Sequence, residues 1–156
     1  MTATAQTVTV SRTFRATKEA AFDAWTNPAS LAQWFGPPGF RAEILTHDLR
    51  VGGDWRFLMT DDKGQGFRHF GTFIAIEPAD RLAFTWASEE QVEGWRDETG
   101  NPTLVTVTFD GNADQVTVMI THENLATEAA RRGLTYGWGE GLACLEEFIR
   151  RGEAGG

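Results

Sequence analysis

The sequence contains few of the residues that build disulfides, metal cages or membrane anchors. Its 156 residues include a single cysteine, Cys144, which can form neither an internal disulfide nor a cysteine cage for a metal and is typical of a reducing compartment. The first ten residues, MTATAQTVTV, lack the basic and apolar segments of a secretory signal, and no later apolar run is long enough to span a membrane. We therefore expect a cytoplasmic protein without a membrane span.

Positive charge and tyrosine are also scarce. Lys and Arg number 14 against 22 Asp and Glu, which gives a formal net charge of −8, whereas nucleic acids and anionic lipid surfaces attract clustered cations. We therefore expect no nucleic-acid partner. One tyrosine stands beside 11 phenylalanines and six tryptophans, so much ring surface requires burial and little of it carries a hydroxyl group. This imbalance favours an apolar interior.

The length favours a single domain over residues 1–156, since the chain is long enough for one hydrophobic core and too short for two. No internal repeat, low-complexity tract or linker divides it. We expect the core over about residues 8–150 and a flexible tail at 151–156.

The apolar pattern predicts one strand, two short helices, six strands and a long helix. Alternation predicts the first strand at 6–14, and cap residues start helices after Thr17 and Asn27. The second helix ends where Trp34 and Phe35 meet the run Gly-Pro-Pro-Gly at 36–39. A period of two between turn signals predicts antiparallel strands over 40–47, 54–60, 67–77, 81–88, 103–110 and 115–122. The irregular acidic stretch 89–102 has a composition typical of a lid.

A long helix over about 127–150 is expected to be the main helix of the core, with Glu146 and Glu147 spaced for ion pairs with Arg150 and Arg151. Its apolar stripe comprises Leu134, Trp138, Leu142, Leu145 and Ile149. Its interior also contains Gly133, Gly137, Gly139 and Gly141. Each interior glycine costs about 0.5–1 kcal/mol relative to alanine, so either the sheet approaches the helix closely there or unfilled volume lies beneath it.

The order of these elements matches a sheet wrapped around a helix, and five stretches carry a closer resemblance. They are Ala24-Trp25-Thr26, LAQWFGPPGF at 31–40, HDLRVGGDWRFLM at 47–59, GTFIAIEPADRLAFTW at 71–86 and THENL at 121–125. They resemble the activator of heat-shock protein 90 ATPase homologue 1-like family, within the START and Bet v 1-like SRPBCC superfamily. The resemblance implies an α+β helix-grip fold, in which a curved antiparallel seven-stranded sheet surrounds a long C-terminal helix in the order β-α-α-β6-α. It also implies an apolar cavity between sheet and helix.

Alternation within this fold predicts which side chains face the cavity. The expected cavity lining comprises Trp34, Trp55, Phe57, Met59, His69, Phe73, Phe84, Trp86, Trp138, Gly141 and Leu142. We assign Trp34 to the cavity wall and Phe35 to the core. The side chains expected on the outer face of the sheet are Phe70, Ile74 and Ile76, which indicate either a covering helix or a homodimer interface.

No motif supports catalytic residues, a metal or a cofactor, so we assign no residues to any of the three and favour a non-enzymatic role. The histidines His47, His69 and His122 are the conventional acid–base candidates near neutral pH, but their spacing matches no zinc site. His69 could offer one polar group inside an apolar pocket, although a satisfied or exposed histidine is the more frequent case. His122 and Glu123 are neighbours on a strand and point to opposite faces, so they form no dyad.

Three functions remain open at this level. The first is a non-enzymatic module that holds a small hydrophobic or amphipathic molecule between the sheet and the terminal helix. The second is an enzyme of cyclase, hydrolase or isomerase type, which would need a polar cavity residue with a displaced pKa. The third is a protein-interaction domain of the co-chaperone kind. In the co-chaperone that gives the family its name, this domain follows a chaperone-binding domain that this sequence lacks, so we expect the family name to denote homology rather than ATPase activation.

Overall fold

The computed structural model describes residues 6–35, 41–88, 103–112, 114–125 and 128–155, and it has the predicted order of elements. These are β1 (Gln6–Phe14), α1 (Lys18–Thr26), α2 (Pro28–Trp34), β2 (Arg41–His47), β3 (Asp54–Thr60), β4 (Gly66–Glu77), β5 (Arg81–Ser88), β6 (Thr103–Gly111), β7 (Val116–Leu125) and α3 (Glu128–Gly155). Helix α3 continues past its predicted end at Arg150, through residues expected to form a tail. The Gly-Pro-Pro-Gly run and the expected lid at 89–102 lie outside the described residues.

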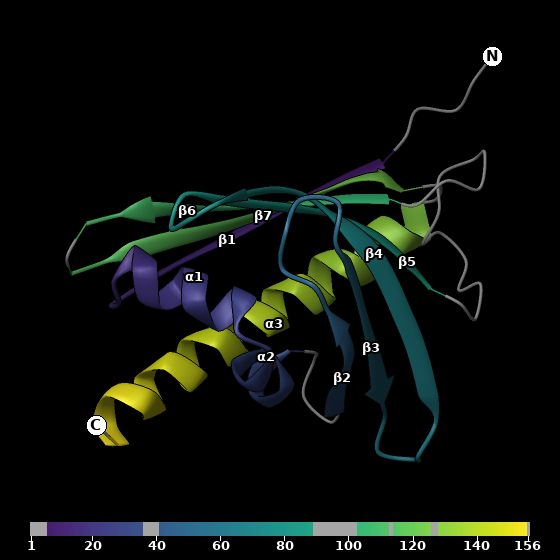
Figure 1. The fold of residues 1–156 in the computed structure, drawn as a ribbon, viewed down its shortest axis with the longest axis horizontal. Coiled ribbons are helices and arrows are strands. Elements are labelled where there is room, and N and C mark those ends of the chain that lie inside the picture. The colour runs from purple at the N-terminus through teal and green to yellow at the C-terminus, as the bar shows by residue number, and fades with distance from the viewer. Residues whose placement is uncertain (1–5, 36–40, 89–102, 113, 126–127, 156) are drawn as a thin grey trace.

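The strands form one seven-stranded antiparallel sheet in the order β1-β7-β6-β5-β4-β3-β2. Strands that follow one another from β2 to β7 are paired, as hairpin connections predict, and β1 joins the far edge beside β7. Figure 1 shows that β1, β6 and β7 run in a different direction from β2, β3 and β4, with α3 passing across the inside of the bend. Helix α3 packs mainly on β1. The predicted helix-grip architecture is confirmed.

Both short helices begin at the predicted N-cap residues, whose side chains accept hydrogen bonds from the first turn. Thr17 caps α1 and Asn27 caps α2, each accepting a hydrogen bond at 3.0 Å from a backbone N–H of the first turn. The indole Nε1 of Trp34 donates to the C=O of Ala24 across 2.9 Å, which fixes α2 against α1. Because α2 also contacts β2 and α3, the two helices lie across one end of the grip.

The concave and outer faces of the strands follow the predicted alternation, except on β4. A bulge between Phe73 and Ala75 shifts the pairing of β4 with β5. The shift leaves Ile74 exposed and turns Ile76 inward, opposite Leu82 and packed on the core. The prediction that Ile76 lies on the outer face was wrong, because a strict period of two does not reveal a bulge.

The core occupies the space between α3 and the concave face of the sheet. The five residues of the predicted α3 stripe are all buried, none more than 9% exposed. They belong to one hydrophobic cluster with inward side chains of the strands, among them Val105, Val107 and Val118. No helix in the described part of the chain has both the length and the apolar character needed to cross a membrane.

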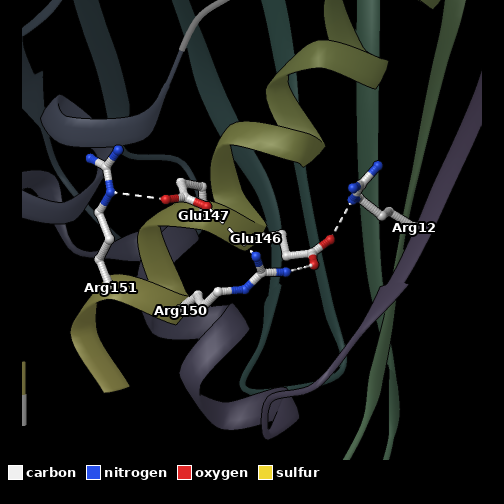
Figure 2. A network of polar contacts seen from close by, with 5 residues as sticks. All are labelled: Arg12, Glu146, Glu147, Arg150 and Arg151. Atoms are coloured by element: carbon white, nitrogen blue, oxygen red, sulfur yellow. Dashed lines mark hydrogen bonds and ion pairs between the residues drawn. The ribbon is translucent and has the colours of Figure 1, made fainter. Parts of the chain in front are cut away.

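Ion pairs line the C-terminal half of α3, and the pair of Glu146 with Arg12 joins this half to β1 (Figure 2). Within the helix, Glu146 pairs with Arg150 at 2.5 Å and Glu147 with Arg151 at 3.1 Å, as the spacing predicts. Arg12 of β1 adds a contact to Glu146 at 2.6 Å, and the hydrogen bond from Arg12 is the main cause of a lowered pKa of the Glu146 carboxyl. Of these three pairs, Arg12–Glu146 joins α3 to β1, whereas the exposed pairs within the helix contribute little because solvent screens them.

Candidate ligand-binding site

An aromatic cluster around Phe35 fills the end of the grip that α2 closes. Phe35 is the C-cap of α2, and its ring lies 4.9 Å from that of Phe57, 5.8 Å from that of Trp86 and 5.9 Å from that of Trp138, centroid to centroid. Such ring pairs contribute about 0.5–1.5 kcal/mol beyond their buried area. The two aromatic residues that end α2 thus have separate structural roles. Trp34 anchors α2 to α1, and Phe35 anchors it to the sheet and to α3.

Beside this cluster lies a partly open pocket between α1, α2 and strands β2 to β5. It encloses about 40 Å³, and its walls are almost entirely apolar. One water molecule needs about 10–15 Å³ of such space, whereas a dry cavity of about 150 Å³ admits benzene. A ligand must therefore also occupy the open mouth or displace a wall residue. The pocket is lined by Trp25, Leu31, Phe35, Ile44, Thr46, His47, Trp55, Arg56, Phe57, Phe73, Leu82, Phe84 and Trp86.

The pocket brings together part of the predicted lining. The predicted residues that line it are Trp55, Phe57, Phe73, Phe84 and Trp86. The predicted residues outside its walls are Trp34, Met59, His69, Trp138, Gly141 and Leu142. Phe35, assigned to the core, both belongs to the core and lines the pocket. The lining residues that the sequence reasoning missed include Leu31, Ile44 and His47, because no local pattern shows that α2 and the edge strand β2 meet the concave face here.

Helix α3 does not line this pocket, and one of its glycines has no close neighbour among the described residues. Gly141 is buried, and a Cβ added there would find no side chain and no strand atom of the described residues within 4 Å. Of the two explanations for the glycines, close approach of the sheet is therefore not found at Gly141 for the described strands. The ring of Trp138, one turn earlier, contacts Phe35 and Trp86, so these three rings stand between α3 and the pocket.

One polar side chain of the pocket is held in a fixed orientation. Nε2 of His47, on β2, lies 2.7 Å from the C=O oxygen of Thr26 at the end of α1. A carbonyl oxygen only accepts, so Nε2 carries the hydrogen, and in the neutral ring Nδ1 remains an acceptor. The imidazole also packs edge-on against Phe73, with centroids 5.7 Å apart at 84°. Nδ1 has no hydrogen-bond partner among the described residues.

A buried polar chain connects α3 to three strands, and the sequence reasoning did not predict it. His122 of β7 is 0% exposed; its Nδ1 accepts from Nε1 of Trp138 at 3.1 Å, and its Nε2 lies 2.7 Å from Oγ1 of Thr103. Thr103 donates to the C=O of Trp86 at 2.8 Å. Because an indole only donates and a carbonyl only accepts, His122 is neutral with its hydrogen on Nε2. Burial lowers the pKa of His122 to about 3.

Two buried indoles of the pocket wall have no hydrogen-bond acceptor for Nε1 among the described residues, namely those of Trp25 and Trp55. The indole of Trp55 lies over Gly71, where an added Cβ would stand 2.7 Å from Nε1. Within the described ranges, no three His, Cys, Asp or Glu side chains are grouped to hold a metal ion. The site therefore offers mainly aromatic surface, with Nδ1 of His47 as a polar acceptor.

A curved antiparallel sheet that grips a C-terminal helix, with an apolar pocket on its concave side, defines a helix-grip α+β protein. The chain belongs to the family described as Activator of Hsp90 ATPase homolog 1-like protein, whose model matches residues 15–150. The family resemblance of the sequence motifs is thus confirmed. A search of curated proteins gives no match.

Solved structures share this fold at low sequence identity. Protein CV1439 from Chromobacterium violaceum is 23% identical with a TM-score of 0.82, over 92% of this chain and 96% of that one. The AHSA1 protein from Silicibacter pomeroyi is 23% identical with a TM-score of 0.75, over 93% and 98%. DynU16, from the dynemicin biosynthetic locus, is 23% identical with a TM-score of 0.71, over 94% of this chain and 48% of that one. At these identities the likeness shows the fold alone.

Proposed function

We propose that this protein binds a small hydrophobic or amphipathic molecule in the pocket between α1, α2 and strands β2 to β5. The observation that carries the proposal is the partly open pocket itself, whose walls are built largely from aromatic rings. Protein interiors leave few voids, and apolar walls with a few fixed polar groups are the usual form of a small-molecule site. In this proposal the protein acts as a single domain in the cytoplasm.

The dimensions of the pocket limit the ligand. The enclosed volume of about 40 Å³ does not hold a whole ring, so the bound molecule extends into the mouth and stays partly exposed. Each apolar Å² removed from water contributes about 25 cal/mol, so a molecule of one ring gains only a few kcal/mol and binds weakly.

Titration with toluene tests the proposal, using two neighbouring substitutions on β2. Ile44 lines the pocket, so Ile44→Phe fills it, whereas Leu45 is 47% exposed and does not line it, so Leu45→Phe is the matched control. We expect saturable binding to the unchanged protein, at least fivefold weaker binding to Ile44→Phe and unchanged binding to Leu45→Phe. An unchanged protein that does not bind, or equal weakening by both substitutions, would contradict the proposal.

An exposed apolar surface favours a second candidate, a protein-interaction domain. This surface comprises Val51 and Ile74, which are 66% and 49% exposed, and Leu49, which precedes Val51 by two residues and is 41% exposed. The backbone N–H of Gly52 bonds to the C=O of Phe73 at 2.8 Å, which brings Val51 next to Ile74. A homodimer or a chaperone could cover this surface. Sedimentation velocity of the purified protein and of Val51→Glu tests the homodimer, which predicts a dimer that the substitution dissociates.

A further inference from the structure

The pocket contains one acceptor in a fixed position. Nδ1 of His47 has no hydrogen-bond partner among the described residues, while Nε2–H donates to Thr26 and the ring edge rests on Phe73. Two contacts thus fix the orientation of a half-buried imidazole in an otherwise apolar wall. The acceptor is already oriented before any ligand binds, which lowers the entropic cost of using it.

The other polar residues at the pocket belong to the opposite face of their strands. Thr46 pairs with Arg56, and His47 pairs with Trp55. Successive side chains of a strand point to opposite faces, and Trp55 lies on the concave face. The side chains of Thr46 and Arg56 are therefore assigned to the outer face. His47 is the polar side chain that this part of the β2–β3 pair directs into the pocket.

An acceptor in an apolar wall discriminates between ligands. A ring that covers Nδ1 without donating to it removes water from the nitrogen, and no new hydrogen bond replaces the one from water. We propose that the pocket selects small aromatic compounds that carry a hydroxyl or N–H group, which donates a hydrogen bond to Nδ1 of His47. This inference rests on the proposed function, because it names the ligand chemistry of the same pocket.

The rest of the pocket fits the aromatic part of such a ligand. Phe73 touches the imidazole and also Phe84, whose ring lies 5.6 Å from that of Trp55, so a continuous ring surface leads from His47 into the pocket. Offset or edge-on contacts with these rings favour a flat aromatic molecule. The small enclosed volume favours a single ring.

Two matched ligands and one substitution test the inference. The ligands are 4-methylphenol and 4-methylanisole, which differ in having an O–H or an O–CH₃ group. The substitution is His47→Phe, which keeps an aromatic ring beside Phe73 and has no acceptor at the position of Nδ1. The unchanged protein should bind the phenol about three- to tenfold more tightly than the ether. In His47→Phe this preference should fall below twofold, while the ether should still bind.

The outcomes separate this inference from the proposed function. If neither ligand binds the unchanged protein, the proposed function fails. If both bind equally, or if the preference persists in His47→Phe, the pocket binds apolar rings but the role of His47 is overturned. His47→Gln is the second variant and should retain the preference, because its amide can donate N–H to Thr26 and present Oε1 as an acceptor in place of Nδ1. Thermal unfolding of both variants verifies that they are folded.

Discussion

The buried histidine predicts a specific loss of stability in mild acid. The pKa of His122 is about 3 in the folded protein, against 6.5 as the ordinary value expected of the unfolded chain. Between these values the unfolded chain binds a proton that the folded protein does not, so the free energy of unfolding falls as the pH falls from 6.5 toward 3. Above pH 6.5 the stabilising contribution of neutral His122 is fully present. The slope approaches about 1.4 kcal/mol per pH unit, which gives a loss of about 2 kcal/mol between pH 7 and pH 5.

Urea unfolding at these two pH values measures the effect, with His122→Gln as the non-titrating variant. Its amide can still donate to Thr103, so the comparison isolates the titration of the imidazole. Glu128 and Glu146, whose pKa values are lowered by arginines, lose their contributions only below their ordinary value of 4.5. The unchanged protein should lose about 2 kcal/mol more than the variant. Equal losses would show that His122 takes up protons in the folded state, which would refute the account of the buried chain.

Three further substitutions have defined outcomes in the same unfolding assay. Trp138→Phe keeps the ring but removes the donor to His122, so stability should fall by about 1–2 kcal/mol, and an unchanged value would deny that hydrogen bond a role. Gly71→Ala places a Cβ 1.8 Å from the C=O oxygen of Thr85, so the free energy of unfolding should fall by more than about 3 kcal/mol. A melting temperature equal to that of the unchanged protein would contradict the close approach of the Thr85 backbone to Gly71. Gly141→Ala meets no described side chain or strand and should stabilise the protein by about 0.5–1 kcal/mol, whereas destabilisation would show that the space is occupied.

The fold follows from the sequence because its main signals are local. Alternation in the strands, caps at Thr17 and Asn27, and the apolar stripe of the last helix are each set by neighbouring residues. The error at Ile76 has a local cause that the pattern does not encode, since a bulge inserts a residue without changing the composition of the strand. The type and order of the elements could thus be predicted from local patterns. The side of the sheet on which a residue lies could not be predicted where a bulge interrupts the alternation.

The site was harder to predict because its contacts are long-range. His47 is bonded to Thr26, and no spacing rule relates the two. The sequence does contain a signal for the burial of His122, because alternation along β7 places it on the same inward face as Val118 and Ile120. Its partner Trp138 comes from another element, so the sequence could indicate a buried polar group but not what satisfies it.

The binding claim is tested most directly by observing the indole N–H signals of the labelled protein by NMR during titration with toluene. The account predicts saturable shifts for Trp25 and Trp55, whose side chains line the pocket, and loss of these shifts in Ile44→Phe. Signals that do not move, or shifts that are largest on the outer face around Ile74, would contradict it and favour the exposed apolar surface as the functional region.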